Sequence, residues 1–200
     1  MLRYLLDAFA GPAALFMYGL LVVLAFALAV IVERATFFAK NHRNAKALLG
    51  AAESAINEGR TLTLGTSPLE TVLSAGLAMP TAELGADAMQ AAAVDAEESV
   101  RQRISYLAAV ASVATMLGLT GTVYGLILAF GALGDVAAAE RAARLSEGSS
   151  TAMATTAFGL FVAIPALAAH AVFEAQARAM LAAIESAAGR LHVFRKARGN

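Results

Sequence analysis

The placement of the charged residues constrains this chain more than any other feature. The sequence contains three long stretches without Asp, Glu, Lys or Arg. They lie between Asp7 and Glu33, between Arg103 and Asp135, and between Glu147 and Glu174. Each is longer than the roughly 20 apolar residues that cross the hydrocarbon core of a membrane. We therefore expect an all-α membrane protein with transmembrane helices at 12–32, 107–133 and 150–173.

The composition agrees with a membrane protein. The chain is 59% hydrophobic, has a mean hydropathy of +0.67 and is only 15% charged, whereas soluble domains carry about 25% charged residues. A net charge of zero argues against nucleic-acid binding. The absence of cysteine excludes disulfides, thiol catalysis and cysteine-ligated metal sites. We expect no cofactor.

The second predicted span has an unusual distribution of side-chain sizes. Drawn as a helix, it places small and hydroxyl residues on one face and large ones on the other. The small face contains Ala111, Ala114, Thr115, Gly118, Thr122, Gly125 and Ala129, and the large face contains Leu119, Val123, Leu126, Ile127 and Phe130. Close packing of helices in lipid favours this arrangement. Thr115 and Thr122 are either packing residues or the lining of a polar path.

The third predicted span also has a hydroxyl-bearing face. Thr151, Thr155, Gly159, Ala166 and His170 share it, and Thr156 borders it. Pro165 lies inside the span and removes one backbone hydrogen bond, which commonly kinks a membrane helix. For His170, both a packing role and proton handling stay open.

These two faces supply the candidate site residues. The two faces suggest that several copies of the chain bring them together around a shared axis. The candidate ion-path residues are Thr122, Thr156, Thr155, Thr151 and Thr115. The candidate helix-packing residues are Gly118, Gly121, Gly125, Gly159 and Pro165.

Basic residues predict the orientation. Twelve of the fifteen Lys and Arg residues lie in the segment after the first span and in the C-terminal tail, which places both in the cytoplasm. The predicted order is a periplasmic tail at 1–11, a cytoplasmic helical segment at 33–106, a periplasmic loop at 134–149 and a cytoplasmic C-terminal helix at 174–200. Breaks in the cytoplasmic segment are expected at Gly59 and at Gly65-Thr66-Ser67-Pro68, and one uninterrupted helix is expected from Ala86 into the second span.

No set of residues suited to catalysis is apparent. His42, His170 and His192 are far apart in sequence, and Ser and Thr occur without a nearby base. We therefore expect that the chain is not an enzyme.

Two long motifs resemble a known family. LAAVASVATMLGLTGTVYGLILAF and LSEGSSTAMATTAFGLFVAIPALAAHAVF resemble the second and third spans of the TolQ/ExbB/MotA proton-channel family, and most closely its TolQ/ExbB branch. Ile31-Val32-Glu33-Arg34 resembles the end of the family's first span. Thr122 matches the threonine of the family's G-T-V motif, and Thr156 matches the threonine of its A-T-A-x-G-L motif.

The resemblance implies a function. It implies a homopentameric ring in the bacterial inner membrane, with two copies of a single-span ExbD- or TolR-like partner in its pore. The partner brings the aspartate that takes up and releases the ion, beside the ring threonines. The resulting work passes to an envelope protein such as TonB or TolA, or to motility machinery.

Two positions depart from the family pattern. Thr115 stands where the family usually has proline, and Thr151 stands where many members have glutamate. The spans therefore contain no acidic residue, so that an acidic ion-binding group would have to come from a partner, and both proton and sodium remain open as the ion. The alternative function is a non-conducting structural scaffold of an envelope complex.

Overall fold

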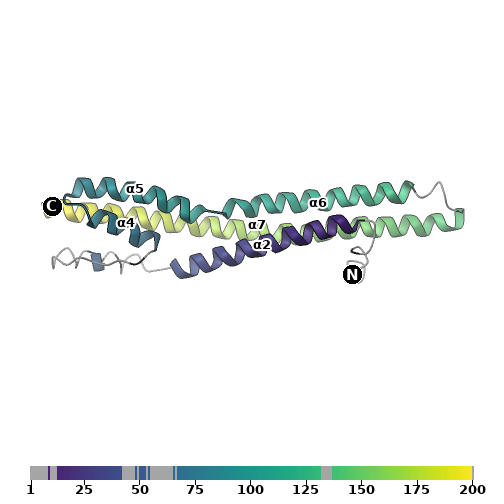
Figure 1. Cartoon of the computed structure of the whole chain (residues 1–200), viewed down its shortest axis with the longest axis horizontal. Helices are drawn as coiled ribbons and strands as arrows, with labels where there is room; N and C mark the ends of the chain where they lie inside the picture. The colour runs from purple at the N-terminus through teal and green to yellow at the C-terminus, as the bar shows by residue number, and fades with distance from the viewer. Residues whose placement is uncertain are drawn as a thin grey trace. The chain divides into compact units, whose positions relative to one another are not determined.

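The structure, a computed structural model, describes Phe9 and residues 13–41, 48, 50–52, 54, 65, 67–131 and 137–199. Its helices are α2 (Ala14–Asn41), α4 (Pro68–Leu77), α5 (Ala82–Arg101), α6 (Ile104–Gly131) and α7 (Ala138–Ala197) (Figure 1). Three helical stretches, Ala14–Asn41, Ala82–Gly131 and Glu140–Ala197, are long and apolar enough to cross a membrane. No strand occurs among the described residues. The predicted all-α fold with three candidate spans is confirmed.

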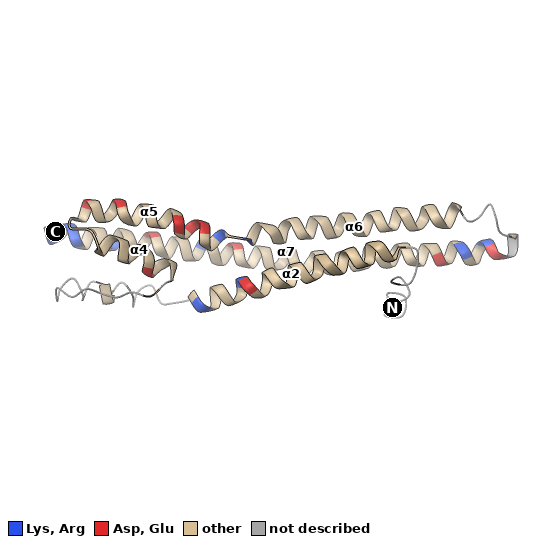
Figure 2. Ribbon diagram, viewed as in Figure 1, with Lys and Arg blue, Asp and Glu red and all other residues tan. Residues whose placement is uncertain are grey.

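The chain forms two compact units. The first contains residues 1–33 and 103–171, and the second contains residues 34–102 and 172–200. Charges are absent from all of α6, and they gather on α5 and towards the two ends of α7 (Figure 2).

The core of the first unit is built from α2, α6 and α7. Small residues dominate it: its buried members are Leu20, Ala27, Val110, Ala111, Ala114, Val162, Ala163 and Ala166. The large side chains of α6 face outward as predicted, with Leu119 at 61% and Ile127 at 62% exposed. This distribution suits a helix whose outer face meets lipid or another protein surface rather than water.

The second unit combines α4, α5 and the C-terminal part of α7. Ser67 caps the N-terminus of α4 through a capping box. The Ser67 hydroxyl accepts a hydrogen bond from the backbone N–H of Glu70, and the Glu70 carboxylate accepts one from the backbone N–H of Ser67. Pro68 lies in the first turn of the helix. The buried core contains Ala52, Leu69, Val72, Leu73, Met89, Ala96, Ile184, Ala187 and Leu191.

Arg195 secures the end of α4 within this unit. Its side chain, only 6% exposed, donates to the carbonyl oxygens of Gly76, at 2.5 Å, and Met79, at 2.7 Å. The last carbonyls of a helix have no partner within the helix, so this guanidinium adds a charged donor to the last turn of α4, at Gly76, and to the chain just after it, at Met79.

The expected uninterrupted helix from Ala86 onward is wrong. α5 ends at Arg101 and α6 begins at Ile104, and Arg103 between them has a φ of 62°. Ion pairs hold residues on either side of the break: Arg101 pairs with Glu174 and Glu97, and Arg103 pairs with Glu33. The carboxylates of Glu174 and Glu97 raise the pKa of Arg101.

Part of the predicted loop at 134–149 is helical, because α7 already begins at Ala138. From there α7 runs without interruption through the third predicted span to Ala197. Most of the predicted tail at 1–11 and the predicted break at Gly59 lie outside the described residues.

Candidate ion-path site at the contact of α6 and α7

Glycines bring the backbones of α6 and α7 into contact. A Cβ atom built on Gly118 would lie 3.1 Å from the carbonyl oxygen of Thr155 and 3.2 Å from the Cα of Gly159. A Cβ atom built on Gly159 would lie 2.8 Å from the carbonyl oxygen of Ala114. Such distances leave no room for a side chain, so glycine at these positions permits the close approach. Gly125 likewise lies against Ala152.

Three threonines gather where the backbones touch. The hydroxyl of Thr122 lies 3.1 Å from the carbonyl oxygen of Gly118, 3.1 Å from that of Ala152, and in contact with the hydroxyl of Thr156. Thr156 also donates to the Gly118 carbonyl at 3.2 Å. Thr155 donates to the Ala152 carbonyl at 2.8 Å and lies 3.4 Å from the Gly118 carbonyl oxygen. Three hydroxyls and two carbonyl oxygens thus form one cluster, which we call the threonine cluster.

The members of the cluster differ in their exposure. Thr155 is 0% exposed, whereas Thr122 and Thr156 are half-buried. Only these latter two present their side chains towards the surface of the protomer. A hydroxyl that lies within the protomer does not line its surface, so the predicted path-lining role does not fit the position of Thr155.

The structure does not bring Thr115 and Thr151 into the cluster. The hydroxyl of Thr115 donates to Ala111 O at 2.9 Å, and that of Thr151 donates to Glu147 O at 3.0 Å. Both are bonds to the carbonyl four residues earlier in the same helix. An α-helix drifts by about 20° per seven residues relative to a seven-residue repeat, which turns Thr115 farther from the packed face than Thr122.

The remaining predicted residues of α7 lie on different faces. Pro165 is exposed, whereas the adjacent Ala166 is buried, so the proline points away from the contact with α6. His170 is half-buried, and its Nδ1 lies 3.0 Å from the carbonyl oxygen of Ile104. Because a carbonyl oxygen only accepts hydrogen bonds, Nδ1 carries the hydrogen. This bond ties the histidine to the first residue of α6.

Prediction from sequence did not find the two carbonyl acceptors. Ala152 takes part through its backbone oxygen, and its methyl side chain gives no signal of this role. The approach of Thr122 to Thr155 and Thr156 depends on how α6 and α7 pack, which the sequence does not give. The glycine-rich face was the one available signal, because a backbone carbonyl is open to a neighbouring helix only where side chains are small.

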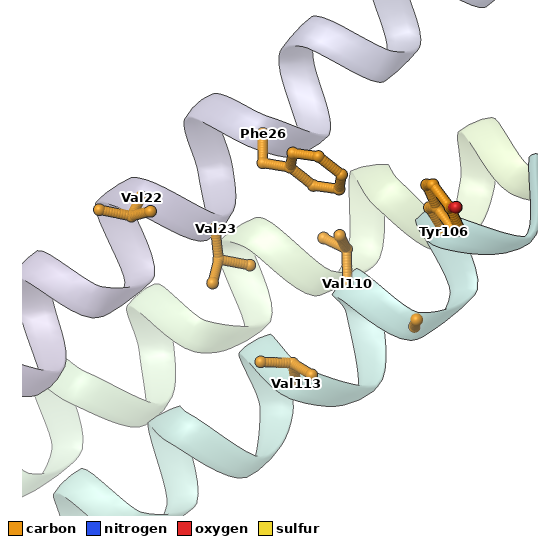
Figure 3. A pocket seen from close by; sticks show the side chains of 7 residues that line it. Val22, Val23, Phe26, Tyr106, Val110 and Val113 are labelled. Carbon is orange, nitrogen blue, oxygen red and sulfur yellow. The ribbon is translucent and has the colours of Figure 1, made fainter. Parts of the chain in front are cut away.

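A groove between α2 and α6 is a second candidate site in the described part of the first unit. It has a volume of about 470 Å³ and is lined by Val22, Val23, Phe26, Tyr106, Ala109, Val110 and Val113 (Figure 3). The lining offers apolar surface and one aromatic ring with a hydroxyl. It therefore lacks the several polar groups that convergent binding chemistry needs, and the threonine cluster is the stronger candidate site.

The cluster offers oxygen atoms without charge. Its hydroxyls can donate to a carboxylate, and its oxygens can accept from a protonated group or coordinate a cation. The spans of α2, α6 and α7 contribute no Asp, Glu, Lys or Arg beside it. The site can therefore solvate an ion or a carboxylate that another molecule brings, but it contains no acidic group of its own.

Parts of this chain are similar in sequence to known proteins. Residues 65–186, more than half of the chain, match the model of the MotA/TolQ/ExbB proton channel family. The Tol-Pal system protein TolQ of Haemophilus influenzae is 44% identical over 73 residues, which are 36% of this chain and 32% of that protein. The Tol-Pal system protein TolQ of Pseudomonas aeruginosa is 36% identical over 96 residues, which are 48% of this chain and 41% of that protein.

The aligned stretches thus cover less than half of each relative. The family match spans α4, α5, α6 and most of α7, and so includes the whole threonine cluster. The chain belongs to the MotA/TolQ/ExbB proton channel family, and it resembles the TolQ branch.

Proposed function

We propose that this chain is the ring-forming subunit of an inner-membrane complex that uses ion flow, most simply proton flow, to do mechanical work on the cell envelope. Its family and the names of its two relatives support this role. A proton that crosses about 150 mV releases roughly 3.5 kcal/mol, which is sufficient to bias a conformational step.

The contact between the Thr122 and Thr156 hydroxyls is the observation that carries the proposal. Polar groups inside a membrane are costly unless they are satisfied, and they commonly mark ion pathways. Here two half-buried hydroxyls meet between α6, which carries no charge, and the stretch of α7 at 148–173, which carries none either. The small faces of α6 and α7 pack against each other within one protomer, so the expectation that these faces bring several copies together is wrong. We propose a homopentameric ring from the family resemblance alone.

The threonine cluster has no acidic group of its own, so a partner would have to supply one. We propose that two copies of a single-span ExbD- or TolR-like protein occupy the pore and supply the carboxylate that the hydroxyls solvate. The recipient of the work is a TonB- or TolA-like envelope protein or motility machinery. In this arrangement the N-terminus is periplasmic, and the second unit lies in the cytoplasm.

A second candidate function is a non-conducting scaffold. The observation in its favour is that each hydroxyl of the cluster has a backbone carbonyl within hydrogen-bonding distance, and packing alone requires no more. Threonines in membrane helices often serve this purpose.

Ion flux separates the two candidates. The complex would be purified from its native membrane through a tag after Asn200 and placed in liposomes that contain a pH-sensitive dye. Proton uptake that follows an imposed membrane potential supports the ion-driven role. Tight liposomes with intact complexes support the scaffold. Flux that requires sodium and ignores pH supports coupling but identifies sodium as the ion.

A further inference from the structure

The threonine cluster contains more hydroxyl donors than its carbonyl acceptors can take. A carbonyl oxygen has two lone pairs. In an α-helix one of them accepts the N–H four residues later, so Gly118 O is engaged by Thr122 N–H and Ala152 O by Thr156 N–H. Each carbonyl then has one lone pair left, and three hydroxyl protons, from Thr122, Thr155 and Thr156, compete for these two positions.

Thr155 takes one of the two positions. Its hydroxyl lies 2.8 Å from Ala152 O, closer than the 3.1 Å from Thr122 to the same oxygen. The Thr155 side chain is 0% exposed, and it fills the space over Gly121, where a Cβ atom would lie 2.9 Å from it. Because the side chain is β-branched and enclosed, its hydroxyl is held at this carbonyl.

The hydroxyls of Thr122 and Thr156 are then left with one carbonyl position, at Gly118 O. When one of them donates there, the other has only its neighbour's oxygen to donate to within the cluster. The contact between the Thr122 and Thr156 hydroxyls is the arrangement expected when two hydroxyl protons share one carbonyl acceptor. Two arrangements of the protons are equivalent in number of bonds, and they interconvert by rotation of two hydroxyl groups.

We infer that Thr155 is a positioning residue that couples the hydroxyls of Thr122 and Thr156, so that one proton of the pair is held only by the other hydroxyl. That proton is the one most easily redirected to a carboxylate or an ion beside the pair. Without the Thr155 hydroxyl, Thr122 donates to Ala152 O and Thr156 donates to Gly118 O, and both protons are held by carbonyls. This inference rests on the proposed function, and it gives Thr155 a positioning role without contact to the ion.

Two variants separate this role from simple packing. Thr155→Val keeps the shape over Gly121 and removes the hydroxyl, whereas Thr155→Ser keeps the hydroxyl and removes the methyl group. We expect proton flux through the reconstituted complex to fall about tenfold in Thr155→Val, the effect of roughly one hydrogen bond on a rate, and to stay near the wild-type value in Thr155→Ser. Thermal melting should rank the two variants in the opposite order, with Thr155→Ser the less stable.

A double variant tests whether Thr155 acts through the pair. In a Thr156→Val background the coupled pair no longer exists, so adding Thr155→Val should cause no further loss of flux. An additional tenfold loss in that background would overturn the inference. So would a flux in Thr155→Ser as low as in Thr155→Val, or the same ranking of the two variants in flux and in melting temperature.

The proposed function fails in a different way. If Thr122→Val and Thr156→Val reduce flux while Thr155→Val conducts like the wild type, the inference falls and the ion-driven role stands. If all three valine variants conduct like the wild type, the hydroxyls have no part in conduction, and the inference falls while the ion-driven role stands. If liposomes that hold the intact wild-type complex take up no ions, the proposed function itself falls. Native mass spectrometry of each variant confirms that the compared complexes are assembled.

Discussion

Gly121 of α6 lies against the side chain of Thr155 of α7, so that a Cβ atom built on the glycine would sit 2.9 Å from both the Cβ and the Oγ1 of the threonine. Real Cβ contacts are longer than this, so any larger residue at 121 must push α7 away. The enclosed threonine has no room to turn aside. The relationship makes the α6–α7 contact sensitive to a single methyl group.

The first prediction follows from this contact. Gly121→Ala should lower the melting temperature of the purified protein, at a cost of about 1–3 kcal/mol for overpacking, and Gly121→Leu should also prevent ring formation in native mass spectrometry. The matched control is Gly189→Ala in α7, where a Cβ atom meets no other atom within 4 Å. Alanine there should stabilise the helix by about 1 kcal/mol. Equal effects of the two alanine substitutions would contradict the packing that we describe.

The three spans were predictable because a membrane enforces a simple rule. A segment that crosses hydrocarbon must be long, apolar and helical, and the charge-free stretches satisfied that rule without any tertiary information. The small face of α6 was predictable for a related reason, since glycine and alanine on one side of such a helix have few other uses.

The break between α5 and α6 was not predictable from local signals. Neither residue between the two helices, Gln102 or Arg103, is a glycine or a proline. Arg103 nevertheless has a positive φ of 62°, a conformation that costs a non-glycine residue roughly 1–2 kcal/mol. The ion pair between Arg103 and Glu33 joins residues far apart in the chain, and no local sequence pattern predicts it. The buried position of Arg195 has the same origin, because its acceptors, at Gly76 and Met79, are backbone oxygens far away in the chain.

The second prediction concerns Arg195. Arg195→Met keeps an apolar stem but removes the guanidinium donor from the carbonyl oxygens of Gly76, in the last turn of α4, and of Met79, just after it. Hydrogen bonds to a charged group contribute about 1.5–3 kcal/mol each, so we expect a loss of about 3 kcal/mol in the free energy of unfolding. The adjacent Lys196 is exposed, and Lys196→Met should change the stability by less than about 0.5 kcal/mol. Similar unfolding curves for the two variants would show that Arg195 does not secure α4.

The third prediction concerns orientation. A reporter inserted at Gly65 or fused after Asn200 should be active in the cytoplasm, and one inserted at Ala138 should be active in the periplasm. The reason is the excess of basic residues in the second unit, which includes the C-terminal tail, because basic segments are retained on the cytoplasmic side. A periplasmic signal from Gly65 would reverse the proposed topology.

The last prediction concerns the two hydroxyls that meet. Valine matches the shape of threonine and cannot form a hydrogen bond, so Thr122→Val and Thr156→Val should lose ion flux in liposomes, and Thr→Ser at either position should retain most of it. The control lies on the same helix: Thr120 is exposed, and its hydroxyl donates only within α6, to Met116 O at 2.8 Å. Thr120→Val therefore removes a hydroxyl and its hydrogen bond to the carbonyl four residues earlier, at a position that lies outside the contact with α7. If Thr120→Val reduces flux as much as Thr122→Val does, the loss reflects helix packing and not a role of the Thr122–Thr156 pair in conduction.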